Sequence, residues 1–236
     1  MNLRRSSFLV LVLTILCGCS LGDDEGLEVF SSSFDFSESQ FGWTADFADY
    51  KAPDSLANKL QFSYAALPDN LSEKKALKIS GINENKSLFM FIKKKLVGLS
   101  PNTEYTIVFD VKFASNAPHG LADGDSVKIK VGATTLEPLK IEQDGFYRMN
   151  IEKGAALSDG RDMVVIGTIG VNNNDHPEVF NFLVKGNGTT SSYPFVLAKT
   201  NSQGEIWLIV GTDSTFKGLT TIYYASIDLI LSVPHQ

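Results

Sequence analysis

A short run of aromatic and acidic residues near the start of the chain has the clearest chemical potential in the sequence. Trp43 follows Gly42, and Asp46, Asp49 and Tyr50 come soon after it. A sugar ring has an apolar face of C–H groups, which an aromatic ring can cover, and a rim of hydroxyls, which carboxylates can hydrogen-bond. The combination predicts a glycan site in which Trp43 or Tyr50 is the platform.

Three further polar residues are candidates for the same site. Arg148 and Asn150 alternate with apolar residues and so share the polar face of a predicted strand, and Asn83 lies in a polar loop. Their guanidinium and amide groups can hydrogen-bond sugar hydroxyls. Trp43 also has a second interpretation as a core side chain, which the sequence slightly favours, whereas Trp207 lies in an apolar run and is predicted to be core.

Residue patterns typical of enzymes are weak. The three histidines, His119, His176 and His235, lie in turns or beside the last residue, and no Gly-x-Ser-x-Gly sequence occurs. No His-x-x-x-His pair or phosphate-binding Gly-rich loop is found either. Glycosidases need two carboxyls about 5–10 Å apart, and 27 acidic residues make such pairs inevitable. No catalytic residue is assigned on this basis.

Loops rich in oxygen ligands leave one structural Ca²⁺ as an option, because Ca²⁺ takes about six to eight oxygen ligands. Asp123, Asp125, Asp213 and Asp228 lie in or near suitable loops. None of these loops matches the EF-hand pattern, so the metal ligands stay open. No other cofactor is expected.

The start of the chain predicts export. Arg4 and Arg5 precede an apolar run over residues 8–16, and small residues follow it. This arrangement describes a secretory signal, and the run is shorter than the roughly 20 residues that span a bilayer. The sequence then reads Leu-Cys-Gly-Cys up to Cys19, which resembles the bacterial lipobox.

The lipobox resemblance implies three segments. Residues 1–18 would be a lipoprotein signal peptide, 19–27 the lipidated Cys19 with an acidic tether, and 28–236 the folded domain. Acyl chains on Cys19 would hold the protein on a lipid bilayer, and Ser20 after it points to the outer membrane of the bacterial envelope. The sequence leaves open whether the protein faces the periplasm or the cell surface.

The folded domain reads as strands separated by turns. Residues 105–113 alternate between apolar and polar, which is the pattern of a half-buried strand, and residues 206–210 are apolar on both faces, which predicts a central strand. The lysines at 93–95 are interpreted as a solvated sheet edge. Short strands with frequent turns predict one antiparallel β-sandwich. Further strands are expected at 29–34, 41–47, 60–65, 77–79, 88–94, 127–131, 147–151, 163–169, 195–200 and 223–231. In the last of these, alternation places Tyr223 on the apolar face with Ile227 and Leu229, and Tyr224 on the polar face.

Two stretches resemble a known type of module. Residues 98–111 resemble the Leu-x-Pro-x-Thr-x-Tyr start of a strand in carbohydrate-binding modules of the galactose-binding-like jelly-roll type, and Tyr-x-x-x-Ile-Asp-Leu-Ile-Leu at 223–231 resembles their last strand. The resemblance implies an all-β jelly-roll fold. Residues 42–50, 88–91 and 204–208 are similar to a family of bacterial secreted proteins and lipoproteins, and that similarity implies no activity.

Composition narrows the function classes. The 236 residues are 43% hydrophobic and 20% charged, which excludes a disordered, collagen-like or coiled-coil chain. A net charge of −6 argues against a nucleic-acid partner. The leading prediction is an envelope lipoprotein that binds a glycan without catalysis. A structural or protein-interaction component of the envelope is the alternative, and a glycoside-active enzyme is the third interpretation.

Overall fold

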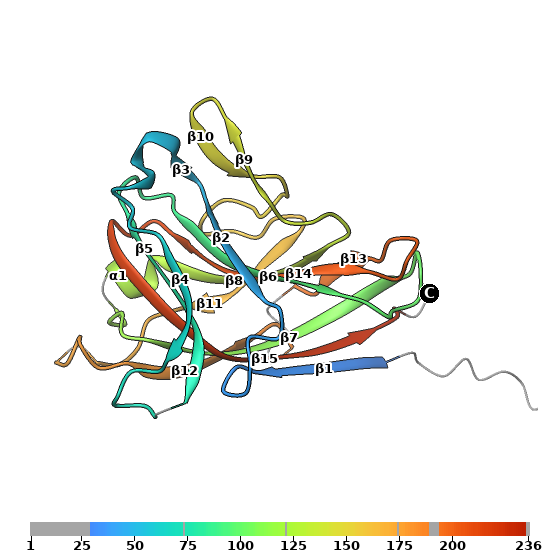
Figure 1. Cartoon of the computed structure of the whole chain (residues 1–236), viewed down its shortest axis with the longest axis horizontal. Helices are drawn as coiled ribbons and strands as arrows, with labels where there is room; N and C mark the ends of the chain where they lie inside the picture. Colours follow the sequence, from blue (N-terminus) through green and yellow to red (C-terminus); the bar gives the residue numbers. More distant parts are fainter. Residues whose placement is uncertain (1–28, 73, 121, 174, 189–193, 235–236) are drawn as a thin grey trace, which may run out of the picture.

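The computed structural model describes residues 29–72, 74–120, 122–173, 175–188 and 194–234. They form two large antiparallel sheets, named sheet A and sheet B, and a small third one (Figure 1). The strands of sheet A are β1 (Val29–Asp35), β4 (Gln61–Ala66), β5 (Lys75–Asn83), β7 (Glu104–Ser115), β12 (Asn181–Gly186), β13 (Val196–Lys199) and β15 (Gly218–Ser232).

The strands of sheet B are β2 (Thr44–Ala48), β6 (Phe89–Leu96), β8 (Val127–Thr134), β11 (Met163–Thr168) and β14 (Ile206–Ser214). The small sheet contains β3 (Tyr50–Lys51), β9 (Lys140–Gln143) and β10 (Phe146–Met149). Helical structure is limited, in the described part of the chain, to the 3-10 turn η1 (Ala52–Ser55) and to α1 (Ala122–Asp125). No described helix has the length and apolar character needed to cross a bilayer.

The connectivity of the sheets is that of a jelly roll. The four successive strands β5, β6, β7 and β8 alternate between sheet A and sheet B. The last two strands then insert between them, because β14 pairs with β6 and β8 while β15 pairs with β5 and β7. Sheets of this kind bury one face of each layer against the other. The all-β jelly-roll prediction is confirmed.

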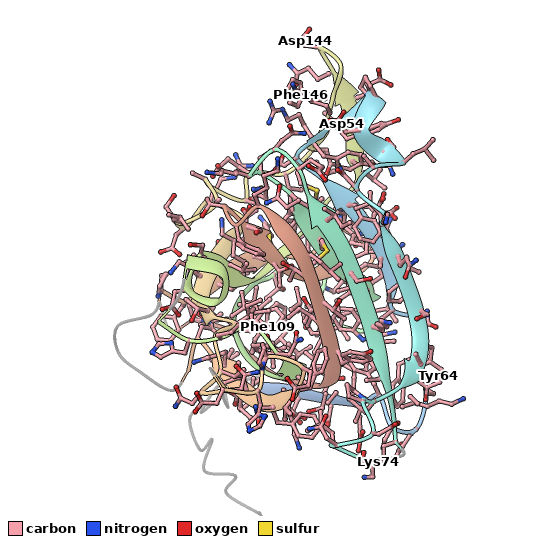
Figure 2. The ribbon with its side chains drawn as sticks, turned by 90° about the vertical axis from the view of Figure 1, so that its left-hand side faces the viewer. Asp54, Tyr64, Lys74, Phe109, Asp144 and Phe146 are labelled. Carbon is pink, nitrogen blue, oxygen red and sulfur yellow. The ribbon has the colours of Figure 1, made fainter. Side chains whose placement is uncertain are left out.

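The core lies between the two sheets and follows from strand alternation. Five alternate residues of β7 are fully buried: Tyr105, Ile107, Phe109, Val111 and Phe113. Figure 2 shows Phe109 in the interior of the sandwich. Burying each such side chain stabilises the fold by about 1.5–3 kcal/mol. The prediction that residues 206–210 form a central strand is also confirmed, since β14 has a partner on each side.

Two local expectations are wrong. In β15, Tyr224 rather than Tyr223 is buried, because the register shifts between Tyr224 and Ser226; such a bulge moves one part of a strand to the opposite face. The interpretation of the lysines at 93–95 as a solvated sheet edge is wrong for Lys93, which pairs with Thr44 of β2, whereas Lys94 and Lys95 lie beyond the last pair between β6 and β2. Lys93 is buried and its Nζ lies 2.7 Å from Glu137 Oε1.

A long connection between β8 and β11, residues 135–162, folds back over the outer face of sheet B. We call it the cover segment. It contains β9 and β10, which stand beside β3 at one end of the sandwich (Figure 1). Its loop buries Ile151 and packs Met149 against Phe89, Phe91 and Ile209 of the sheet. The outer face of sheet B is therefore a second, smaller apolar layer.

Candidate functional site

A cleft of about 370 Å³ opens where the cover segment meets the loops around residues 49 and 86. Asp213 of β14 lies at its base and is buried. The cleft is amphipathic, because its lining combines charged and apolar side chains. The other charged residues of the lining are Asp49, Lys86, Arg148, Glu152 and Lys153. The apolar residues are Met149, Ile151, Ala155 and Ala156.

A buried network of charges forms the base of the cleft. Asp213 Oδ2 lies 2.5 Å from Lys153 Nζ and 3.1 Å from Lys130 Nζ. Lys130 projects from β8 toward the cover segment and also donates to the carbonyls of Lys153 and Ala155, at 3.0 and 2.5 Å. Buried charges are stable only when they are paired and hydrogen-bonded. The network therefore holds the cover segment against the outer face of sheet B.

The two lysines of this network differ electrostatically. Burial lowers the pKa of Lys130, because the attraction of Asp213 offsets only part of the desolvation. Burial acts in the same direction on Lys153, but Asp213 and Asp49 together outweigh it and raise the pKa of Lys153. Lys153 is therefore the firmly charged member, held between two carboxylates.

Asp49 reaches Lys153 because the chain turns sharply between β2 and β3. Its backbone adopts a left-handed conformation (φ 60°), which Asp tolerates better than most residues. The Asp49 N–H donates to the Tyr147 carbonyl at 2.7 Å, and Ser87 Oγ donates to the Asp49 carbonyl at 2.7 Å. The Asp49 carboxylate then lies 2.8 Å from Lys153 Nζ.

Arg148 stands on the exposed rim of the cleft. Its guanidinium lies over the ring of Phe146, 4.6 Å from the ring centre, and Figure 2 shows Phe146 near the tip of the projecting hairpin. The nearest carboxylate contact, Arg148 Nη1 to Asp49 Oδ1, is 3.8 Å long, and the side chain is 46% exposed. This distance exceeds a hydrogen bond, so the donors of Arg148 still face solvent.

The third acid of the cleft, Glu152, is held by the backbone of its own loop. Its two carboxylate oxygens accept the N–H groups of Gly154 and Arg161, at 3.0 and 2.6 Å. Gly154 has φ 76°, and an added Cβ there would lie 2.4 Å from the Asp159 carbonyl oxygen. The loop is thus closed on itself and fixes Lys153 at the cleft.

The structure brings together two of the residues that the sequence proposed, Asp49 and Arg148, in this cleft. Asp46 lies outside its lining and pairs with Lys140 at 3.0 Å. Tyr50 is buried with its ring 5.1 Å from that of Tyr147, so it offers no exposed platform.

The two asparagines have structural roles in the loops beside the cleft. Asn83 is buried, where its amide accepts the Ser87 N–H and donates to the Ser214 carbonyl. Asn150 holds the cover segment together through the Leu139 N–H and the Glu137 carbonyl. Both side chains hydrogen-bond backbone groups. Asn83 is buried, so the expectation that it binds a glycan is wrong, whereas Asn150 is exposed outside the lining of this cleft and its role stays a prediction.

The interpretation of Trp43 as a ligand platform is wrong. The side chain is 0% exposed and makes edge-to-face contacts with Phe34 and Phe36 in the main core. The turn before it, with positive φ at Phe41 and Gly42, points the indole inward and delays the start of β2 to Thr44. Trp207 shows the reverse, since it is partly exposed on the outer face of sheet B between Lys93 and Lys95.

Sequence reasoning missed the lysines that organise the cleft. Alternation correctly places Lys130 on the outer face of β8, but nothing local indicates that residues 153 and 155 cover it. The sequence indicates Asp213 only as a possible calcium ligand. Among the described residues, no three His, Cys, Asp or Glu side chains gather as a metal site would require.

Comparison with known proteins returns no matching family model and no matching curated protein. Solved structures do match. The family 11 carbohydrate-binding module of a Clostridium thermocellum cellulase matches with a TM-score of 0.38 and 12% identity, over 88% of this chain and 96% of that module. The xylan-binding domain of a Paenibacillus barcinonensis protein matches with a TM-score of 0.37 and 13% identity, over 87% and 95%.

A further match is the enzymatically active domain of a tailspike protein from bacteriophage CBA120. Its TM-score is 0.32 and its identity 10%, over 78% of this chain but only 19% of that one.

Proposed function

We propose that this protein is a non-catalytic glycan-binding module and that the cleft on sheet B is its binding site. The observation that carries the proposal is the amphipathic lining of the cleft. Met149, Ile151 and Ala155 contribute apolar atoms to the lining, while Arg148 and Lys86 contribute hydrogen-bond donors. A pyranose ring has an apolar C–H face and a rim of hydroxyls, which match these two kinds of surface.

Preorganisation supports binding rather than loose surface contact. Lys153 is fixed by two carboxylates, and Asp49 by backbone hydrogen bonds on both sides. Groups that are already ordered lose little conformational entropy when a ligand arrives. The cleft therefore presents an ordered base with an exposed cationic rim.

The same network argues against catalysis by these acids. Asp213 Oδ1 is buried, and Asp213 Oδ2 contacts two lysines. Glu152 accepts two backbone N–H groups, and Asp49 contacts Lys153. A glycosidase needs one carboxyl that can donate a proton and another that can reach the sugar. None of these three carboxylates is free for either role.

Affinity gel electrophoresis against a panel of polysaccharides tests the proposal. We expect at least one polysaccharide to retard the wild-type protein and the Ala155→Trp variant to lose that retardation, because the indole fills the cleft. Leu157→Trp is the matched control, since Leu157 is exposed on the same loop but does not line the cleft. Equal retardation of both variants, or no retardation of the wild type, would contradict the proposal.

One observation favours the alternative of a protein-interaction component. Val29, Leu197 and Ile230 are each more than half exposed on the outer face of sheet A. If this face mediates self-association, sedimentation velocity will show a dimer that Ile230→Ser abolishes. If the wild-type protein stays monomeric up to high concentration, self-association through this face is contradicted.

We also propose that the module is a lipoprotein of the bacterial outer membrane, anchored through Cys19. The signal sequence and Cys19 lie outside the described residues, so the support is the lipobox resemblance alone. Metabolic labelling with palmitate should mark the wild-type protein but not Cys19→Ala, and membrane fractionation should place the label in the outer membrane. Unlabelled protein that still begins at Met1 would contradict the anchor.

A further inference from the structure

The cleft contains charges of two kinds, those already paired within the protein and those that are not. Its three acids are all engaged: Asp49 and Asp213 by lysines, and Glu152 by two backbone N–H groups. Lys153 and Lys130 are engaged in turn by those carboxylates and by carbonyls. At the base of the cleft the carboxylates of Asp49 and Asp213 balance the ammonium groups of Lys130 and Lys153, while Glu152 keeps a negative charge that backbone N–H groups stabilise.

The two cations of the cleft without a close carboxylate partner both lie on the rim. Arg148 forms no hydrogen bond to any described residue, and its contact with Asp49 is 3.8 Å. Lys86 is exposed, has a left-handed backbone (φ 58°), and forms no ion pair with any described residue. In a chain with net charge −6, two uncommitted cations beside one cleft are a local reversal of sign.

Phe146 gives Arg148 a defined position. Stacking on the ring holds the guanidinium plane while its edge donors stay free, 4.6 Å above the ring centre. A guanidinium held in this way presents two parallel N–H groups, the geometry that binds a carboxylate through two hydrogen bonds. Lys86 supplies a flexible point charge on the same rim.

We infer that the glycan bound in this cleft is anionic, and specifically that its sugars carry carboxylates, as in a polyuronate. The inference rests on the proposed function and specifies its ligand. The carboxylate of the sugar would pair with Arg148, assisted by Lys86, and the C–H face of the ring would lie on Met149 and Ala155. The balanced ion pairs at the base would bind hydroxyls.

Isothermal titration calorimetry with matched polymers tests the inference. The probes are oligosaccharides of polygalacturonate, alginate and glucuronan, together with the carboxyl-reduced form of each, which keeps the linkage but removes the charge. Dextran sulfate is the probe for unspecific anion binding. We expect at least one polyuronate to bind and its reduced form to bind about tenfold more weakly or not at all.

The variants locate the effect. Arg148→Gln should raise the Kd for the polyuronate about tenfold, and Lys86→Gln should raise it less. Arg161→Gln is the matched control, because Arg161 lies on the same cover segment, is exposed and pairs with Asp162 outside this cleft. Its Kd should equal that of the wild type.

The outcomes separate the two proposals. If a reduced polymer binds as tightly as its acid form and Ala155→Trp blocks it, the glycan-binding function stands and the anionic specificity is wrong. Dextran sulfate binding as tightly as the polyuronates, or an unchanged Kd in Arg148→Gln, also overturns the specificity. If no polymer binds, both proposals fail.

Discussion

The two outer faces of the sandwich contain the same kinds of charged side chain in opposite environments. On sheet A, a groove of about 460 Å³ has Lys74, Lys75 and Lys112 on its lining together with Asp35 and Asp228, all of them exposed. On sheet B, the cover segment buries Lys130, Lys153 and Asp213 in one network. The residue types are the same, and one connecting segment makes the difference.

The comparison indicates that the burial of charged side chains, and not their presence alone, decides which ion pairs stabilise the fold. Exposed pairs are screened by water and contribute about 0–1 kcal/mol. Breaking a buried pair costs several times more, because it leaves an uncompensated charge in a medium of low polarity. Sheet B should therefore respond strongly to charge removal, and sheet A weakly.

The sharpest test removes the shared counter-ion on sheet B. Asp213→Ala leaves Lys130 without its carboxylate and Lys153 with only Asp49. We expect the free energy of unfolding in urea to fall by about 3–5 kcal/mol. On sheet A, Asp228→Ala should change it by less than about 0.5 kcal/mol. Similar losses for the two variants would refute the contrast between the faces.

A second test displaces the cover segment sterically. Gly132 lies on the outer face of β8, and a Cβ there would come within 2.1 Å of the Asp162 carbonyl oxygen and 2.7 Å of Met163 Cγ. Gly132→Ala should lower the stability by about 1–3 kcal/mol through overpacking. It should also speed amide hydrogen exchange in residues 150–162 more than in sheet A. Uniform exchange would show that the cover segment is not a separate layer.

A third test addresses the exposed charges of sheet A. Lys112 Nζ lies 4.6 Å from the centre of the Phe182 ring, in contact with solvent. Cation–π pairs at exposed sites contribute about 0.5–1 kcal/mol, so thermal unfolding of Lys112→Gln should show a loss no larger than that. A loss of stability as large as that of Asp213→Ala would mean that the exposed charges of sheet A also stabilise the fold strongly.

The smallest expected effect is a pH dependence. The Ser37 N–H donates to the Asp35 carboxylate at 2.9 Å and lowers the pKa of Asp35 below its usual 3.8. A depressed pKa in the folded state contributes stability above pH 3.8 that is lost as the pH falls through the folded value. Asp35→Asn should therefore lose less stability than the wild type between about pH 5 and pH 2.

Because Asp35 is exposed, the difference should stay below about 0.5 kcal/mol. Urea midpoints measured across that pH range for both proteins would show it. A steeper acid loss in the variant than in the wild type would contradict the assigned direction.

Much of the fold could be predicted because strand alternation is a local property. The face of β7 from Tyr105 to Phe113 and the central position of β14 both follow from it. The bulge in β15 could not be predicted, because either Tyr223 or Tyr224 satisfies a period of two, and only pairing with β7 decides between them.

The candidate site was predicted only in part, and the failures have a common cause. Asp49 and Arg148 were proposed by type, and the pairing of β3 with β10 brings them together. Trp43 takes its core interpretation, because a turn with positive φ directs it inward, whereas Trp207 was expected in the core and is partly exposed beside polar neighbours on a different strand. Contacts between distant segments decide all of these positions.

The position of β14 and β15 has a consequence for how the chain acquires its structure. Both strands follow their partners in the sequence, yet each is the middle strand of a sheet: β14 pairs with β6 and β8, and β15 pairs with β1, β5 and β7. Neither layer can therefore close before its middle strand has been synthesised. A topology dominated by such distant pairings folds slowly, so the two layers should form late and together.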